Sequence, residues 1–259
     1  MTEKAELVFE GLLNKLYTIP FQETSKIKDI EAKIFTELQK YPANIYGLIT
    51  LMFLQIMQAN RVGAKDTAFR IWDIGGDLSP YFELVYIENL INIGLLDMAK
   101  ILLTTKFENI RENIDDFYSV MVKYAIVIGD LSLLSKIKQY DEYASENETL
   151  YEFAEMYQES GYSGQFKNIQ KMIIEQQGNN ICAYEYNLYD DRGFPELEIE
   201  IYNNTDSNQI VKEQEQIDKK IDAYWFSCGK ERLYNHSVTF KNIREHERWI
   251  EVEADAMEE

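Results

Sequence analysis

The chain has 259 residues and a formal net charge of −19, and its composition excludes several classes of protein. Only 12 glycines and 4 prolines are present, which favours helices over an all-β or loop-rich fold. The acidic charge argues against direct binding to nucleic acid or to an anionic membrane surface, because both depend on lysine and arginine. Two cysteines are too few for a disulfide framework and are typical of a reducing compartment.

The N-terminal sequence lacks the positive charge and the long apolar stretch of a signal peptide. The most apolar run, 45–57, is far shorter than the roughly 20 residues that a membrane span needs. We therefore expect a cytoplasmic protein that does not associate with membranes.

Apolar residues recur at helical spacing through the first two thirds of the chain, which predicts a series of helices. The first covers 3–17 and ends before Pro20, and the second covers 23–39 and ends before Pro42. Four pairs of helices follow, over 45–59 and 64–74, 81–93 and 95–105, 116–128 and 131–140, and 150–160 and 165–176.

A glycine separates the two helices of each pair, and a residue expected at the helix contact follows five positions later. The four instances are Gly63 with Ala68, Gly94 with Ala99, Gly129 with Leu134, and Gly161 with Phe166. The glycines are 31, 35 and 32 residues apart (94 − 63, 129 − 94, 161 − 129), a spacing typical of stacked helical hairpins. Each glycine is expected to end a helix in the left-handed conformation.

This repeat resembles the tetratricopeptide family over at most residues 45–176. That family has two helices in roughly 34 residues, a glycine near the turn between them and a small residue early in the second helix. The first two units match this pattern, and Pro80 lies where such a unit often ends. The third and fourth units match only in part, and the tryptophan and Leu-Gly pair typical of the family are missing from every unit.

The resemblance implies that the first helix of each hairpin lines the inner surface of the array. Such surfaces resemble peptide-binding grooves, in which asparagines and charged side chains hold an extended backbone or a chain terminus. The residues expected to point there are Met57, Asn60, Tyr81, Glu88, Asn92, Lys123, Tyr151 and Glu155. The competing interpretation is that these are ordinary solvated helix residues. The residues expected in the core instead are Tyr86, Leu90, Tyr118, Phe153 and Tyr157.

The pattern changes near Gly178, where we place the boundary between a helical-repeat domain, 1–178, and an acidic α+β domain, 179–259. The second part combines strand-like and helical stretches, which favours one helix packed on one face of a sheet. The predicted fold class is therefore mostly α with a smaller α+β part: a helical-hairpin array followed by a small antiparallel sheet with one helix.

The strands of the C-terminal part are predicted from period-two patterns and turn residues. Strict alternation predicts a half-buried strand over 196–201. Its inward residues are Leu197, Ile199 and Ile201. Asp206 or Ser207 is expected to cap a helix that runs to about Trp225. The buried stripe of that helix is expected to be Ile210, Ile217, Ile221 and Trp225. The other predicted strands cover 181–189, 237–243 and 248–253.

The sequence contains no recognisable catalytic, zinc-binding or phosphate-binding motif, so we expect no cofactor and no enzyme activity. Glu198, Glu200 and His246 are weak candidates for a metal site, because carboxylates on one face of a strand can bind a divalent cation. A solvated strand face and a surface histidine are the competing interpretation.

These observations favour a non-enzymatic scaffold or adaptor that binds a segment of a protein partner through the repeat groove. The acidic charge allows that partner to be basic. One alternative is an acidic inhibitor or immunity-type protein, which neutralises a basic, nucleic-acid-acting enzyme by charge complementarity. A second alternative is a metal-dependent hydrolase with its site in the C-terminal part.

Overall fold

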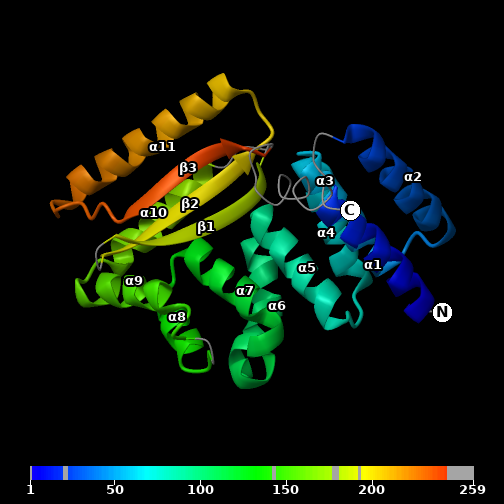
Figure 1. Ribbon diagram of the computed structural model, residues 1–259, viewed down its shortest axis with the longest axis horizontal. Helices are drawn as coiled ribbons and strands as arrows, with labels where there is room; N and C mark the ends of the chain where they lie inside the picture. Colours follow the sequence, from blue (N-terminus) through cyan, green and yellow to red (C-terminus); the bar gives the residue numbers. More distant parts are fainter. Residues whose placement is uncertain (1, 20–22, 142–143, 177–180, 192–193, 244–259) are drawn as a thin grey trace, which may run out of the picture.

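The computed structural model describes residues 2–19, 23–141, 144–176, 181–191 and 194–243. Across these residues the chain forms eleven α-helices and three β-strands. The helices coloured from blue to green in Figure 1 form an arc, the strands lie along its inner side, and the last helix lies beside the last strand. The predicted fold class, mostly α with a smaller α+β part, is confirmed.

Ten helices precede the sheet in the predicted order. They are α1 (Thr2–Thr18), α2 (Thr24–Lys40), α3 (Ile45–Met57), α4 (Arg61–Ile74), α5 (Pro80–Asn92), α6 (Leu96–Glu108), α7 (Ile110–Ile128), α8 (Leu131–Lys138), α9 (Glu148–Glu159) and α10 (Ser163–Gln176). The largest difference is at α7, which begins six residues before the predicted start (116 − 110), because Ile110 and Ile114 extend its buried stripe. Every helix in the described part of the chain is too short or too polar to cross a membrane.

A residue in the left-handed conformation ends the first helix of each hairpin. It is Gly94 (φ 75°), Gly129 (φ 68°) and Gly161 (φ 72°) in the last three hairpins, as predicted. In the first hairpin it is Ala59 (φ 55°), whereas Gly63 lies inside α4, so the prediction for Gly63 is wrong by one helical turn (63 − 59 = 4). The corrected spacings are 35, 35 and 32 residues (94 − 59, 129 − 94, 161 − 129).

The four turns share one backbone hydrogen bond, which identifies them as equivalent. The N–H groups of Asn60, Leu95, Asp130 and Tyr162 each donate to the carbonyl five positions earlier, the long-range bond of a Schellman motif. The residue at the helix contact in the first hairpin is therefore Ala64 (59 + 5), with Ala68 one turn farther along α4. All the contact residues are buried, namely Ala64, Ala68, Ala99, Leu134 and Phe166.

The sheet follows the helices and has the order β1 (Ile181–Asp191), β2 (Phe194–Asn203), β3 (His236–Asn242). β1 and β2 form the predicted antiparallel hairpin, whereas β3 pairs with β2 in parallel, so the sheet is mixed rather than antiparallel. The reason is the helix α11 (Ser207–Cys228), which carries the chain back along the sheet before β3 begins. The strand predicted over 248–253 lies outside the described residues.

Helix α11 begins where its sequence predicts and ends three residues beyond the predicted Trp225 (228 − 225). The Asp206 side chain caps it by accepting hydrogen bonds from the N–H groups of Asn208 (2.9 Å) and Gln209 (3.1 Å). Three of the four predicted stripe residues are buried, namely Ile217, Ile221 and Trp225, and Ile210 is half-buried. The stripe therefore fixes which face of α11 packs inward.

The inner face of the sheet packs on the array. Leu197, Ile199 and Ile201 of β2 are buried, as predicted, and they belong to one continuous core with the helices. The core also holds Tyr86, Leu90, Phe153 and Tyr157, whereas Tyr118 is half-buried. The boundary proposed at Gly178 lies outside the described residues, and the division into two domains stays a prediction.

Candidate functional site

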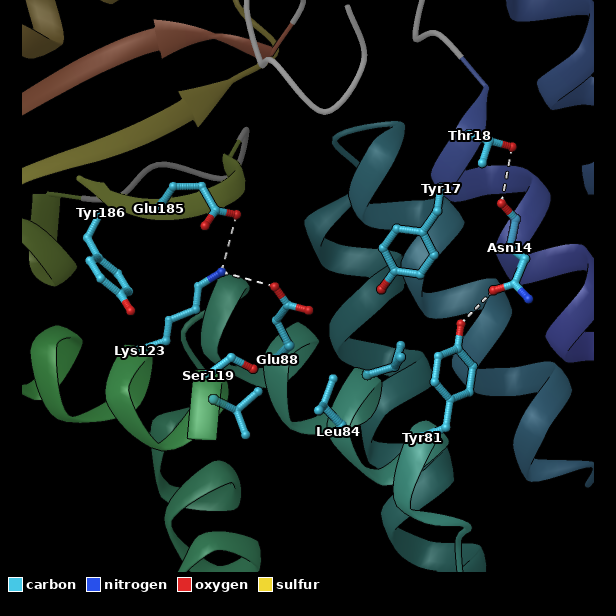
Figure 2. Close-up of a pocket in the computed structure, with 12 residues that line it drawn as sticks. Asn14, Tyr17, Thr18, Tyr81, Leu84, Glu88, Ser119, Lys123, Glu185 and Tyr186 are labelled. Carbon is cyan, nitrogen blue, oxygen red and sulfur yellow. Dashed lines mark hydrogen bonds and ion pairs between the residues drawn. The ribbon is translucent and has the colours of Figure 1, made fainter. Parts of the chain in front are cut away.

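A cavity of about 730 Å³ lies between α1, α5, α7 and β1 (Figure 2). The elements that line it are helices of the array and β1, so the cavity lies where the array meets the sheet. The residues that line it are Asn14, Tyr17 and Thr18 of α1, Tyr81, Leu84, Val85 and Glu88 of α5, Ser119, Val120 and Lys123 of α7, and Glu185 and Tyr186 of β1.

Helix α5 contributes four lining residues, more than any other element, and they share one face of the helix. Tyr81, Glu88 and Asn92 are seven and four residues apart (88 − 81, 92 − 88), which places them in one row along the helix. At the start of this row the Tyr81 hydroxyl donates a hydrogen bond to Asn14 Oδ1 of α1 (2.8 Å). At its end Asn92 Oδ1 accepts one from the backbone N–H of Tyr184 in β1 (3.3 Å). The row therefore joins the first helix to the sheet.

Lys123 is the one cation among the residues that line this cavity, and its side chain is almost wholly covered. Its residue exposure is 4%, and its ammonium donates to Glu88 Oε1 (3.2 Å) and to Glu185 Oε1 (3.4 Å). A charge removed from water in this way needs an opposite charge nearby to remain stable. The two carboxylates meet that need and tie α7 to α5 and to β1.

Among the residues that line the cavity, Glu88 and Glu185 carry carboxylates and Lys123 carries the one ammonium. Within the described residues Lys123 is the only polar partner of Glu88. Figure 2 shows the second carboxylate oxygen of Glu88 turned away from Lys123, toward the side on which Tyr17 lies. One carboxylate oxygen is therefore directed into the cavity.

Three tyrosines add aromatic faces and hydroxyl groups to the cavity wall, namely Tyr17, Tyr81 and Tyr186. Burial raises the pKa of Tyr81, and the Glu10 carboxylate raises it further. Burial also raises the pKa of Tyr186, with contributions from Tyr118 and Glu185. These two side chains are therefore neutral at neutral pH, and each offers an aromatic ring and one hydrogen-bonding tip.

The structure brings three of the eight predicted groove residues together in this cavity: Tyr81, Glu88 and Lys123. Asn92 is next to them on α5, but it is buried and bound to the backbone of β1. Met57 is buried in the core of the array. Only part of the predicted groove is therefore gathered, in a local cavity where the sheet meets the array.

The remaining predicted groove residues have contacts elsewhere. Asn60 is the N-cap of α4, where its Oδ1 accepts the N–H of Gly63 (3.0 Å). Tyr151 is buried, and its hydroxyl donates to Asp141 Oδ2 (2.6 Å). Glu155 forms an exposed ion pair with Lys138 (2.6 Å). None of these three lines the cavity.

Sequence reasoning missed the contributions of α1 and β1 to the site. Tyr17 comes from a helix that precedes the repeats, and Glu185 comes from the part of the chain that was assigned to another domain. Their own patterns give no signal of a shared site, because Tyr17 continues an ordinary helix and Glu185 lies at an outward position of a strand. Only the tertiary fold places them beside α5.

The weak metal candidates Glu198 and Glu200 are engaged within the sheet. Glu198 accepts hydrogen bonds from Thr239 Oγ1 (2.7 Å) and the Tyr189 hydroxyl (3.2 Å). Burial alone would raise the pKa of Glu200, but hydrogen bonds from Lys241 and Tyr202 lower it below the usual value.

The third weak candidate, His246, lies outside the described residues. Over the residues that the structure does describe, no group of three or more His, Cys, Asp or Glu side chains is arranged to hold a metal ion.

Comparison with known proteins adds no relative to this description. No protein-family model, no curated protein and no solved structure matches the chain. The structure shows an array of packed helical hairpins, and the likeness to tetratricopeptide repeats rests on that arrangement and on its spacing.

Proposed function

We propose that the protein is a non-enzymatic scaffold that binds a segment of a protein partner in the cavity between α1, α5, α7 and β1. The observation that supports this proposal is the convergence of Tyr81, Glu88 and Lys123 on one cavity at the inner surface of the array. Inner surfaces of helical-hairpin arrays are extended concave surfaces suited to binding.

The size and lining of the cavity suit a short segment. A volume of about 730 Å³ lies within the range of roughly 300–1,000 Å³ that is common for ligand pockets. Tyrosines offer a large contact area with few rotatable bonds, so their side chains lose little conformational entropy on binding. Asn14 and Ser119 add polar groups that can meet the backbone of a bound segment.

Filling the cavity tests this proposal. Ser119 is exposed and lines the cavity, so Ser119→Trp places a large ring in the binding space. Thr104→Trp adds the same ring at an exposed position of α6 that does not line the cavity and serves as the matched control. The measurement is affinity isolation from native lysate at high salt, followed by mass spectrometry.

We expect one stoichiometric partner to be captured by the wild type and by Thr104→Trp, and lost with Ser119→Trp. Capture of the same partner by Ser119→Trp would contradict the assigned site. Metal-dependent turnover of nucleotides, nucleic acids or phosphoesters by the purified protein would contradict the non-enzymatic function.

The alternative of an acidic inhibitor rests on a different surface, the outer face of the sheet. Glu196 and Glu198 of β2 are half-buried and lie on the same face of that strand. Together with the net charge of −19, this row of carboxylates favours a basic partner. Binding to a basic enzyme that weakens steeply as salt is raised, and that Ser119→Trp leaves unchanged, would favour the inhibitor over the scaffold.

A further inference from the structure

The chemistry of the cavity restricts which partner segment fits, and the restriction rests on the proposed function. The positive charge of the site is not offered to a ligand, because Lys123 is 4% exposed and bound to both Glu88 and Glu185. An acidic side chain or a chain-terminal carboxylate would have to displace those two bonds. The cavity therefore disfavours an anionic segment.

The charge that the cavity does offer is negative. Lys123 is the only polar partner of Glu88 within the described residues, and the Glu88 side chain keeps 17% of its surface exposed. Its second oxygen points into the cavity (Figure 2).

The aromatic lining, like this negative charge, favours a positively charged ligand group. Tyr81 and Tyr186 are neutral, and the π-face of a tyrosine attracts a cation that lies within about 6 Å of the ring. Tyr17 brings a third ring, on the same side of the cavity as Tyr81 and across from Tyr186 (Figure 2). A carboxylate framed by aromatic rings is an arrangement suited to a guanidinium or ammonium group.

We infer that the cavity binds a basic side chain of the partner segment, with Glu88 as its ion partner. Arginine fits better than lysine, because its planar guanidinium stacks on a tyrosine ring while it donates to a carboxylate. Lys123 has a separate role, since it holds Glu88 and Glu185 in place and leaves the second oxygen of Glu88 to the ligand.

A selection experiment identifies the preferred side chain directly. A phage-displayed library of random dodecapeptides is selected against the intact wild type, against Glu88→Gln and against the control Glu83→Gln. Glu83 is on the same helix, but it pairs with Lys106 (2.8 Å) and lines a different cavity. We expect the wild type and Glu83→Gln to enrich peptides with arginine or lysine at one fixed position, and Glu88→Gln to lose that preference.

A second measurement needs no protein variant. One selected peptide and its citrulline version, which keeps the shape of arginine and removes its charge, are compared by fluorescence anisotropy on the wild type. A charge-assisted bond to Glu88 predicts a loss of about tenfold or more in affinity for the citrulline peptide. On Glu88→Gln, with folding checked by its melting temperature, the two peptides should bind with similar affinity.

The outcomes separate the charge inference from the proposed function. Selected peptides that lack a basic position, but whose binding Ser119→Trp abolishes, would overturn the role of Glu88 and leave the scaffold proposal standing. Selection that yields no peptides, or yields only peptides that Ser119→Trp still binds, would overturn both. Equal affinity of the arginine and citrulline peptides for the wild type would also overturn the charge inference.

Discussion

Lys123 on α7 and Glu185 on β1 are 62 positions apart in the chain and form an ion pair of 3.4 Å. Together with the bond from Lys123 to Glu88 (3.2 Å), this pair joins two helices of the array to the sheet. The same ammonium therefore has a structural task, which is to compensate two carboxylates at the site where the two layers meet.

Removing that ammonium should destabilise the fold. In Lys123→Met the carboxylates of Glu88 and Glu185 lose their common partner, and each is partly shielded from water. We expect a loss of about 2–3 kcal/mol in the free energy of unfolding, below the value for a fully buried pair because both carboxylates keep some exposure. Urea denaturation at neutral pH measures this loss.

The control for this prediction is an exposed ion pair. Lys26 and Glu23 pair on the surface of the second helix with side-chain exposures of 62% and 36%, so Lys26→Met should leave the unfolding midpoint almost unchanged. A midpoint for Lys123→Met that equals that of Lys26→Met would show that the buried pair contributes nothing to stability.

His236 on β3 is held neutral in the core. The Tyr184 hydroxyl donates to Gln170 Oε1 (2.8 Å), so the amide nitrogen of Gln170 donates to Nε2 of His236 (3.1 Å), which is then unprotonated. Burial, and next the charge of Arg232, lower the pKa of His236 to about 3. The unfolded chain returns this group to about 6.5.

This depressed pKa predicts a pH dependence with a defined sign. Below about pH 6.5 the unfolded state binds a proton at His236 that the folded state does not, so stability falls as the pH falls toward 3. Relative to His236→Gln, the wild type should lose roughly 2–3 kcal/mol between pH 6.5 and pH 4.5. Urea titrations of both proteins at these pH values check it, and parallel pH profiles would contradict it.

The glycines at the hairpin turns differ in what they tolerate. Gly161 has φ 72° with open space around it, so Gly161→Ala should cost about 1 kcal/mol for the backbone conformation alone. Gly129 has a similar φ of 68°, but a Cβ there would lie 2.6 Å from Cα of Lys167, so Gly129→Ala should cost clearly more.

Gly164 is the matched control for these two substitutions. It lies in α10 with open space around it and without a positive φ, so Gly164→Ala should leave stability unchanged or raise it slightly. Thermal unfolding of the three variants gives the order of their midpoint temperatures. A midpoint for Gly129→Ala at or above that of Gly161→Ala would show that α10 moves aside without cost.

The helices were predictable because each carries its own buried stripe. In α2 the residues Ile27, Ile30, Ile34 and Leu38 are all buried, and their spacing alone defines the helix. Helix α11 was predictable for the same reason, with the cap at Asp206 marking its start. Such patterns are local, so they can be recognised in the sequence without any knowledge of the tertiary fold.

The first hairpin turn was not predictable from the glycine pattern. Ala59 takes the left-handed conformation that glycine takes in the other three hairpins, and nothing in its sequence neighbourhood marks it. The spacing of the glycines predicted that Gly63 ends a helix. Its N–H instead donates to the capping side chain of Asn60 in the first turn of α4. A tertiary fold can place an unfavoured residue in a turn when the packing of both helices requires it.

The candidate site was predictable only where it follows one helix. Tyr81 and Glu88 share a face of α5, and their seven-residue spacing made that visible. Tyr17 and Glu185 come from elements separated from them by long stretches of chain. The parallel pairing of β3 with β2 likewise joins segments that are distant in the sequence. Contacts between distant segments produce no periodic pattern of residues in a single sequence.

Arg61 links the first hairpin to the second in a way that can be tested. Its guanidinium is buried, and Nε and Nη2 both donate to the carbonyl of Ile93 at the end of α5 (3.0 and 2.7 Å). Arg61→Lys keeps the charge and loses this two-pronged bond, so we expect a loss of about 1–2 kcal/mol in the free energy of unfolding. Arg70→Lys is the control, because Arg70 is exposed and makes one long bond to the carbonyl of Pro42 (3.3 Å). Equal urea midpoints for the two variants would mean that the carbonyl of Ile93 is satisfied without the guanidinium.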